Sequence, residues 1–222
     1  MKVALLQPQF APNLYDLAAM LKADLVVWND LEQWHRKGRT HRAAIKGDNG
    51  QQWINIPVKT EDRKKPIREV RIEQNEEWIE PFWNALHHSY SEATWYDFFA
   101  DELEADISKF SEFKLLSELN TWFFGRLMKY LEFGVDYKLA SQLPDFDPNP
   151  DVFTQQVGAD VLYQEHDSRH YQWRSDEAIE AQPKHPEYSQ LGNDFIPELS
   201  LFDLLFNEGK ESFRVFEKLV RE

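Results

Sequence analysis

Two short apolar runs near the N-terminus, residues 3–6 and 24–28, constrain the fold more than any other feature of the sequence. Continuous apolar runs of this length, each closed by polar residues, are typical of strands buried on both faces. Between them, Asn13 can cap a helix in which Leu14 and Leu17 recur at the helical spacing. A strand, a helix and a strand in this order normally form a parallel crossover, and ligands bind where such strands end. The sequence therefore predicts an α/β fold with a short, mostly parallel sheet near the N-terminus.

The middle of the chain predicts a hairpin followed by a helical region. Polar and apolar residues alternate over residues 51–58 and again over 67–72, which favours two strands paired across the charged turn between them. Helical spacing then predicts a helical subregion over about 78–134. Its last helix, over 113–133, is expected to begin behind a cap at Ser111.

The C-terminal stretch HPEYSQLGNDFIPELSLFDLLFNEG, residues 185–209, combines a polar loop with an apolar helix. Ser200 and Asp203 have the spacing of a capping box, and Gly209 lies where a helix stops. We expect this short helix to fix the preceding loop against the domain. A loop fixed at both ends is a plausible binding element.

Composition limits the classes of function. The chain has 222 residues, of which 42% are hydrophobic, enough for one domain over residues 1–222. Its 39 acidic and 25 basic residues give a net charge of -14, which disfavours binding to nucleic acid or anionic lipid. The start of the chain lacks a signal-peptide core, and no apolar run approaches the length of a membrane span. We therefore expect a cytoplasmic protein without membrane insertion. Because the chain has no cysteine, thiolate catalysis and cysteine-ligated zinc are excluded.

Three polar residues at predicted strand ends are substrate-binding candidates: Gln7, Asp30 and Arg42. Asp30 can accept hydrogen bonds from sugar hydroxyls, and the planar guanidinium of Arg42 can pair with a carboxylate or a phosphate. In the alternative interpretation, Asp30 and Arg42 pair with each other across a loop. Gln7 would then belong to an ordinary strand end.

The C-terminal loop supplies a second group of candidates. His185 can act as a general base near neutral pH, and Tyr188 and Gln190 can bind a polar substrate. The alternative is a structural loop whose polar side chains bond its own backbone. Asn207, in the last apolar helix, is either a further substrate-binding residue or a partner for free carbonyls at the helix end. The eight tryptophans, Trp53 among them, can line a sugar-stacking cleft or belong to the core.

Neither a metal nor a cofactor is predicted. His166 and His170 have a spacing that zinc uses on helices, but they follow a predicted strand and lack helical patterning, which favours a solvated turn. A Walker-type phosphate loop, a dinucleotide fingerprint and a nucleophile elbow are all missing from the sequence.

Several blocks of the sequence, in order along the chain, resemble the WbqC-like family. They include QPQFAP at residues 7–12, Gly158-Ala159-Asp160 before a predicted strand, and the terminal HPEYSQ and FIPELSLFDLLFNEG blocks. The resemblance covers nearly the whole chain, and the terminal block is its most specific part. It implies a bacterial protein connected with surface-polysaccharide assembly that moves an acyl or aminoacyl group onto a sugar.

The expected function is therefore that of a transferase acting on a sugar or nucleotide-sugar, with an acyl group donor as a further small-molecule partner. The sequence departs from the family pattern at Leu6, where relatives commonly have His, and at His41, where they commonly have Asn. The turn over residues 165–170 also lacks the glycine-containing form of relatives. These departures motivate the alternative of a non-catalytic ligand-binding or scaffold member of the same family.

Overall fold

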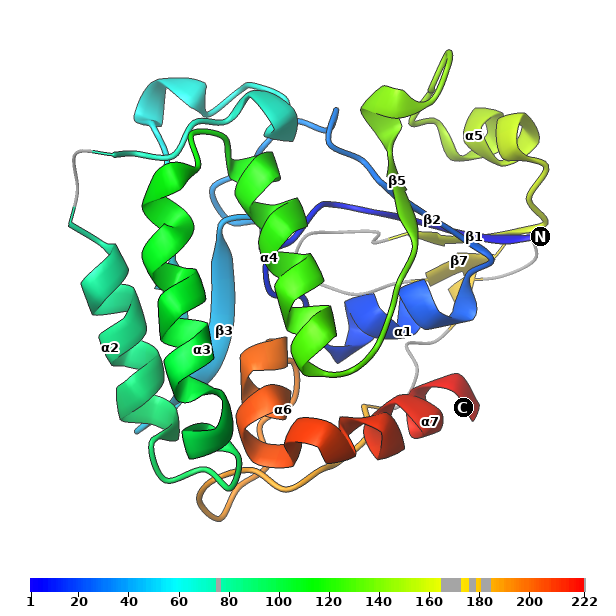
Figure 1. Ribbon diagram of the computed structural model, residues 1–222. Coiled ribbons are helices and arrows are strands. Elements are labelled where there is room, and N and C mark those ends of the chain that lie inside the picture. The colour runs from blue at the N-terminus through cyan, green and yellow to red at the C-terminus, as the bar shows by residue number, and fades with distance from the viewer. Residues whose placement is uncertain (75–76, 165–172, 176–178, 181–184, 222) are drawn as a thin grey trace.

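A six-stranded sheet, ordered β5-β2-β1-β6-β7-β8, organises the fold (Figure 1). The computed structural model describes residues 1–74, 77–164, 173–175, 179–180 and 185–221. The strands of the sheet are β1 (Lys2–Leu6), β2 (Leu25–Trp28), β5 (Tyr137–Leu139), β6 (Val161–Gln164), β7 (Trp173–Ser175) and β8 (Ile179–Glu180). β1 pairs in parallel with β2 and β6, and β2 with β5, whereas β7 and β8 are added antiparallel. The predicted α/β fold with a mostly parallel sheet is confirmed.

Seven α-helices lie in the described residues. They are α1 (Leu14–Lys22), α2 (Ile79–Tyr90), α3 (Tyr96–Ser108), α4 (Leu116–Tyr130), α5 (Pro150–Val157), α6 (Leu201–Glu208) and α7 (Phe213–Arg221). Figure 1 shows α2, α3 and α4 beside one another, away from the N-terminal end of β1. The helical middle region and the C-terminal loop and helix are thus present as predicted. No helix of the described residues has the length and apolar character needed to cross a membrane.

Alternating side chains of the central strands serve two hydrophobic clusters. Val3, Leu5 and Val27 pack with Phe153 of α5 in a small cluster. The alternate residues of the same strands, including Ala4 and Leu6, belong to the larger core, which also contains residues of α1, α4, α6 and α7. Since strand side chains alternate between faces, α5 covers one face of the sheet and α1 the other.

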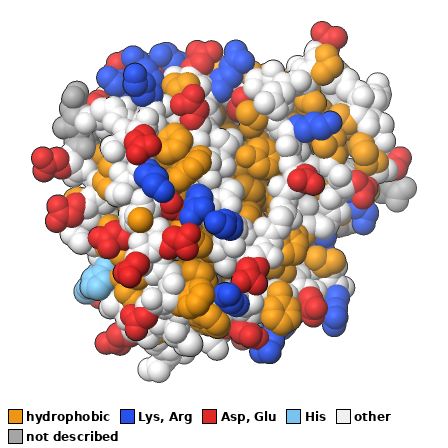
Figure 2. Space-filling model, viewed as in Figure 1, with side chains coloured by type: hydrophobic (Ala, Val, Ile, Leu, Met, Phe, Trp, Pro, Cys, Tyr) orange, Lys and Arg blue, Asp and Glu red, His pale blue; other side chains and the backbone are white. Residues whose placement is uncertain are grey.

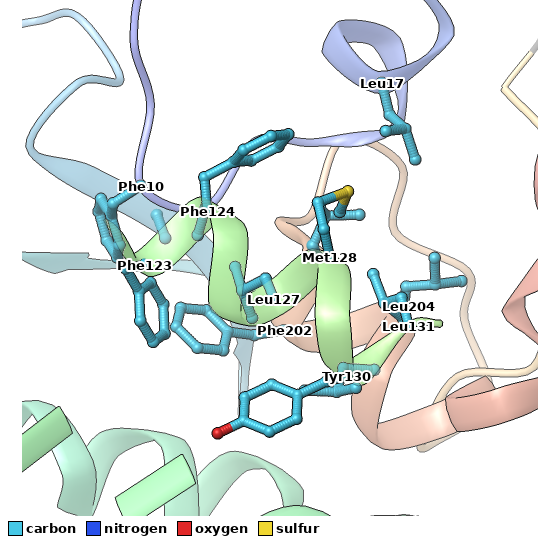
Figure 3. Close-up of a cluster of buried hydrophobic side chains, with 14 of the residues drawn as sticks. Phe10, Leu17, Phe123, Phe124, Leu127, Met128, Tyr130, Leu131, Phe202 and Leu204 are labelled. Atoms are coloured by element: carbon cyan, nitrogen blue, oxygen red, sulfur yellow. The ribbon is translucent and has the colours of Figure 1, made fainter. Parts of the chain in front are cut away.

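The larger core brings the two ends of the chain together (Figure 3). Phe10, from the loop after β1, packs against Phe123 of α4 at a ring-centroid distance of 6.1 Å and against Phe202 of α6 at 6.3 Å. Phe123 and Phe202 are 5.7 Å apart, and all three rings are fully buried. Aromatic contacts of this kind add to the large area that each ring removes from water. The loop after β1 and the start of α6 are therefore fixed side by side.

The predicted hairpin has a different partner strand. Residues 51–55 pair with the preceding segment, as β3 (Arg42–Gly47) and β4 (Gly50–Asn55), through a turn at Asp48 and Asn49. The segment predicted as the second strand forms a 3₁₀ helix over Ile67–Glu69 and meets the first only at one isolated bridge, Val58 to Ile72. The prediction was wrong because the segment before residue 51, in which Ala43 and Ile45 face the core, pairs with residues 51–55 across a two-residue turn.

The predicted cap of the longest helix is also wrong. α4 begins at Leu116, after Leu115, and has no side-chain cap. Ser111 instead donates from its hydroxyl to the carbonyl of Ser108 at 3.3 Å, within the 3₁₀ turn Lys109–Glu112. Hydroxyls of this kind bond to a carbonyl one turn back as readily as they cap.

Charged groups connect α3 and α4. Asp106 is buried and accepts hydrogen bonds from Arg126, Tyr130 and Lys109. These bonds lower the pKa of Asp106 although burial opposes them.

On the face viewed in Figure 2, acidic and basic side chains are interspersed with hydrophobic ones.

We expect Asn13→Ala to lower the free energy of unfolding by about 1–2 kcal/mol, because it removes the cap of α1. The Asn13 side chain accepts from the amides of Tyr15 at 3.0 Å and Asp16 at 3.2 Å, and the Asp16 carboxylate accepts from the Asn13 amide at 3.2 Å. Urea denaturation measures the change. Asn193→Ala, in the exposed part of the C-terminal loop, serves as the control; equal losses from the two variants would contradict the capping role.

Candidate functional site

A pocket lies where the loop after β1, the start of β3 and the segment before α6 meet. Its lining residues are Gln9, Ala11, Asn13, Arg39, Arg42, Ala43, Ala44, Trp53, Glu198 and Ser200. The enclosed space holds about one water molecule, so the pocket is far smaller than the pockets of about 300 Å³ or more that hold drug-sized ligands. The pocket therefore suits one small polar group or one end of a longer substrate.

Hydrogen bonds to backbone groups hold the walls of this pocket. Asn120 of α4 donates from its side-chain amide to the carbonyls of Pro8 at 2.9 Å and Thr40 at 2.8 Å, which fixes both loops to one helix. On the C-terminal side, the amide of Ser200 donates to Ala44 at 2.8 Å and that of Leu201 donates to Pro12 at 2.8 Å. The two ends of the chain thus form one rigid rim.

One of the two arginines in the pocket has its charge balanced within the protein. Arg39 binds Asp16 through both terminal nitrogens, at 2.6 and 3.0 Å, in a largely buried bidentate pair. In the orientation that satisfies both of its polar atoms, the Gln9 amide donates to Asp16 at 3.1 Å and accepts from Arg39 at 3.2 Å. These three side chains stabilise the loop after β1.

Arg42 is oriented but not neutralised. Its Nε donates to the carbonyl of Gly38 at 2.9 Å, its Nη2 donates to that of Lys37, and its guanidinium stacks over Trp53 at 4.1 Å from the ring centroid. Within the described part of the chain, no carboxylate lies within 4.0 Å of it. Burial and the charge of Arg39 lower the pKa of Arg42. An anion at this place would relieve both effects, so Arg42 is the strongest candidate for binding one.

Glu198 and Ser200 complete the polar lining. Glu198 is exposed and adopts a left-handed backbone conformation, with φ of 65°, which is uncommon for a residue with a side chain. Such conformations persist only where the surroundings fix them, and they concentrate at functional sites. Ser200 is only 2% exposed, and its hydroxyl has no hydrogen-bond partner within the described residues. Glu198 is therefore accessible to a ligand, whereas the Ser200 hydroxyl is enclosed.

His185 lies beside this pocket with both ring nitrogens engaged. Nε2 accepts from the amide of Glu198 at 3.2 Å, and Nδ1 lies 3.1 Å from the carbonyl of Pro186. The ring contacts Tyr15 at 5.2 Å and Phe195 at 5.5 Å between centroids. Burial lowers the pKa of His185, in keeping with a neutral ring that donates from Nδ1. Its role as a general base stays a prediction, and it requires Nε2 to release the Glu198 amide.

Tyr188 and Gln190 bind a carboxylate of the protein itself. Oδ2 of Asp203 accepts from the Tyr188 hydroxyl at 2.7 Å and from the Gln190 amide at 2.9 Å. Gln190 also pairs with the backbone of Ile196, accepting at 2.8 Å and donating at 2.9 Å. These bonds hold the C-terminal loop over α6.

The predicted capping box at the start of α6 is wrong. The Ser200 hydroxyl makes no cap bond, and the carboxylate of Asp203 points to Tyr188 and Gln190 instead. Asp203 has no exposed surface, and burial raises its pKa to about 6, although hydrogen bonds from Tyr188 and Tyr90 oppose this change. The loop that folds back over the helix supplies donors that outcompete the local cap.

Three other predicted residues do not line the pocket. Asp30 accepts from the amide of Ser141 at 2.9 Å and from its hydroxyl at 2.6 Å, and it does not pair with Arg42. Gln7 donates to Glu32 at 2.6 Å. Asn207 donates to the carbonyl of Asp203 at 2.8 Å, within α6. Of the predicted strand-end group, the structure brings only Arg42 into the pocket; His166 and His170 lie outside the described residues.

Comparison with known proteins identifies the family. The model of the WbqC-like protein family matches residues 7–215. The chain belongs to this family. A curated relative from Mycobacterium tuberculosis (strain ATCC 25618 / H37Rv), named Uncharacterized protein Rv1507c, is 30% identical over 230 residues, covering 95% of each chain. No solved structure matches the chain. In this WbqC-like protein, both walls of the pocket, Gln9 and Ser200 among them, fall within the matched region.

Proposed function

We propose that this WbqC-like protein is a transferase that moves an acyl, aminoacyl or related group onto a sugar or nucleotide-sugar in bacterial surface-polysaccharide biosynthesis. The reaction takes place in the cytoplasm. The resemblance of the ordered sequence blocks to the family supports the reaction class. The observation that carries the assignment to a site is the Arg42 guanidinium, which is fixed by two carbonyls and Trp53 but has no carboxylate partner among the described residues.

The pocket is suited to one end of the substrate. A phosphate or carboxylate can pair with Arg42 through its planar fork. Because the enclosed space holds only about one water molecule, the rest of a nucleotide-sugar would lie outside the mouth. In the transfer step, a hydroxyl or amine of the acceptor forms a bond to the acyl carbon, loses its proton to a base, and the donor's leaving group departs with the bonding electron pair.

A direct test incubates the full chain with UDP-N-acetylglucosamine and either acetyl-coenzyme A or an alanyl thioester. We expect mass spectrometry to detect a sugar nucleotide heavier by the transferred group. Thermal stabilisation by UDP-N-acetylglucosamine without any product would favour the alternative, a non-catalytic ligand-binding member of the family, because a ligand that binds only the folded state raises its stability.

The predicted base is tested by a pair of variants at His185. If His185 takes the proton, both His185→Ala and His185→Gln lose at least about 100-fold in turnover. Gln places an oxygen near the position of Nε2 and can still accept from the Glu198 amide. Retained turnover in His185→Gln, with loss in His185→Ala, would instead assign His185 to positioning Glu198.

A further inference from the structure

We propose that one end of the molecule docks on a lipid surface that carries anionic headgroups. The docking surface is the basic platform, which we define as residues 33–37 and 63–68. This docking goes beyond the proposed function and does not depend on it, because the residues of the platform do not line the Arg42 pocket.

The charge of the chain is unevenly distributed. Residues 36–71 contain 11 of the 25 basic residues but only four of the 39 acidic ones, a net charge of +7, so the rest of the chain carries -21. Figure 2 shows several Lys and Arg side chains together at the top of the molecule, and acidic ones over α2 and α3. The total of -14 disfavours an anionic partner for the chain as a whole, but this asymmetry gives one end the opposite preference.

The two segments of the basic platform lie side by side. The amide of Trp34 donates to the carbonyl of Lys65 at 2.9 Å, and Gln33 and Pro66 form an isolated bridge. Buried side chains anchor both segments: Trp34 belongs to the first, and Asp62, which has no exposed surface, binds Lys65 of the second at 2.6 Å. The backbone of the platform is therefore fixed before any partner arrives.

Four of the six basic side chains of the platform are unpaired. Arg36, Lys37, Arg63 and Lys64 are exposed, and none of them has an ion-pair partner within 4.0 Å in the described part of the chain. Neither segment contains an acidic residue. Like charges held close together repel one another, so an anionic surface that approaches the platform is attracted by all four.

The platform fits a lipid surface better than it fits nucleic acid. Because Trp34 is buried, the platform has no exposed Trp, Tyr or Phe ring on which a base can stack. A nucleic-acid strand would continue past the platform into regions of negative charge, whereas a plane touches only the end that approaches it. Charges more than about 8 Å away are largely screened at physiological salt, so the acidic remainder of the chain opposes this contact weakly.

Contact with the lipid is expected to stop at the headgroups. The exposed large hydrophobic side chains of the described residues, Phe98 and Phe213 among them, all lie outside residues 32–71. The platform therefore offers no apolar side chain that could enter the hydrocarbon. Binding that rests on charge alone is reversed by salt.

The test measures sedimentation of the full chain with vesicles. We expect binding to vesicles in which about one-third of the lipid is phosphatidylglycerol, and none to vesicles of phosphatidylcholine alone. Each basic residue near an anionic surface contributes about fivefold to binding. Two double variants, Arg36→Gln with Lys37→Gln and Arg63→Gln with Lys64→Gln, are therefore each expected to weaken vesicle binding about 25-fold.

A third double variant is the matched control. Arg214→Gln with Lys218→Gln removes two exposed basic side chains of α7, outside the platform, and should bind vesicles as the wild type does. Because all the exchanged side chains are exposed, we expect similar midpoints of urea denaturation for the wild type and the three variants.

Any of three results would overturn the inference. The first is equal binding, or no binding, to the two kinds of vesicle at low salt. The second is a loss in the α7 variant as large as in the platform variants. The third is tighter binding of a single-stranded DNA than of the anionic vesicles, which would assign the platform to nucleic acid. The vesicle assay contains no sugar nucleotide, so its failure would leave the proposed transferase standing.

Discussion

Arg42→Gln is expected to weaken binding of the substrate end held in the pocket by about 30- to 100-fold. Truncating one member of a partly buried, hydrogen-bonded charge pair costs at least about 2 kcal/mol, and each 1.4 kcal/mol is a factor of about ten. Calorimetric titration with UDP-N-acetylglucosamine measures the change. The loss should fall on affinity, because within the described part of the chain Arg42 interacts with two carbonyls and Trp53 and with no carboxylate.

Stability of the same variant separates binding from folding. Arg42 has no ion pair to lose among the described residues, so we expect a change of only about 1 kcal/mol in the free energy of unfolding. Arg68→Gln is the control, an exposed arginine whose nearest carboxylate, Glu69, is 3.8 Å away. Equal losses of affinity in the two variants would show that general charge, and not the pocket, attracts the ligand.

Relative to the wild type, Asp203→Asn is expected to gain up to about 3 kcal/mol in the free energy of unfolding between pH 4 and 7. A pKa that differs by one unit between the folded and unfolded states corresponds to about 1.4 kcal/mol. Burial raises the pKa of Asp203 from 3.8 to about 6 in the folded protein. The stabilisation that the protonated carboxyl contributes is complete below pH 3.8 and is lost as the pH rises through about 6. Asn stays neutral, so the variant gains on the wild type as the pH rises.

The difference between variant and wild type has to be measured, because other groups act in the opposite direction. Burial lowers the pKa of His41 to about 4, so His41 destabilises the fold as the pH falls below 6.5. Urea denaturation at pH 4, 5.5 and 7 isolates Asp203. Tyr188→Phe removes a hydrogen bond that lowers the pKa of Asp203 and should move its titration to higher pH. Parallel pH profiles for Asp203→Asn and wild type would contradict a titrating carboxyl in this range.

Local signals made the N-terminal unit predictable. The runs that became β1 and β2 are apolar without interruption, and Asn13 and Asp16 cap the N-terminus of α1 within four residues. The hairpin was mispredicted although Gly47-Asp48-Asn49-Gly50 is a turn signal of its own. The clear alternation over residues 67–72 indicated a strand, but the surrounding tertiary packing gives it a different structure.

Tertiary contacts explain why the candidate site was harder to predict. The spacing of Ser200 and Asp203 satisfies the rule for a capping box, yet the competing donors Tyr188 and Gln190 come from a loop more than ten residues earlier. Arg42 was predicted as an anion-binding residue from its type and its place near strand ends. Glu198 has no local pattern that marks it, because its importance depends on a left-handed backbone and on its proximity to β3.

The central claim is that the two ends of the chain form one ligand site at Arg42, and the NMR signals of arginine side chains test it most directly. In protein labelled with ¹⁵N, the Nε–H signal of Arg42 is assigned by its loss in Arg42→Gln. We expect UDP-N-acetylglucosamine to move this signal and to leave that of Arg126, which is bound to Asp106, unchanged. Binding of UDP-N-acetylglucosamine without movement of the Arg42 signal would contradict a ligand site at Arg42.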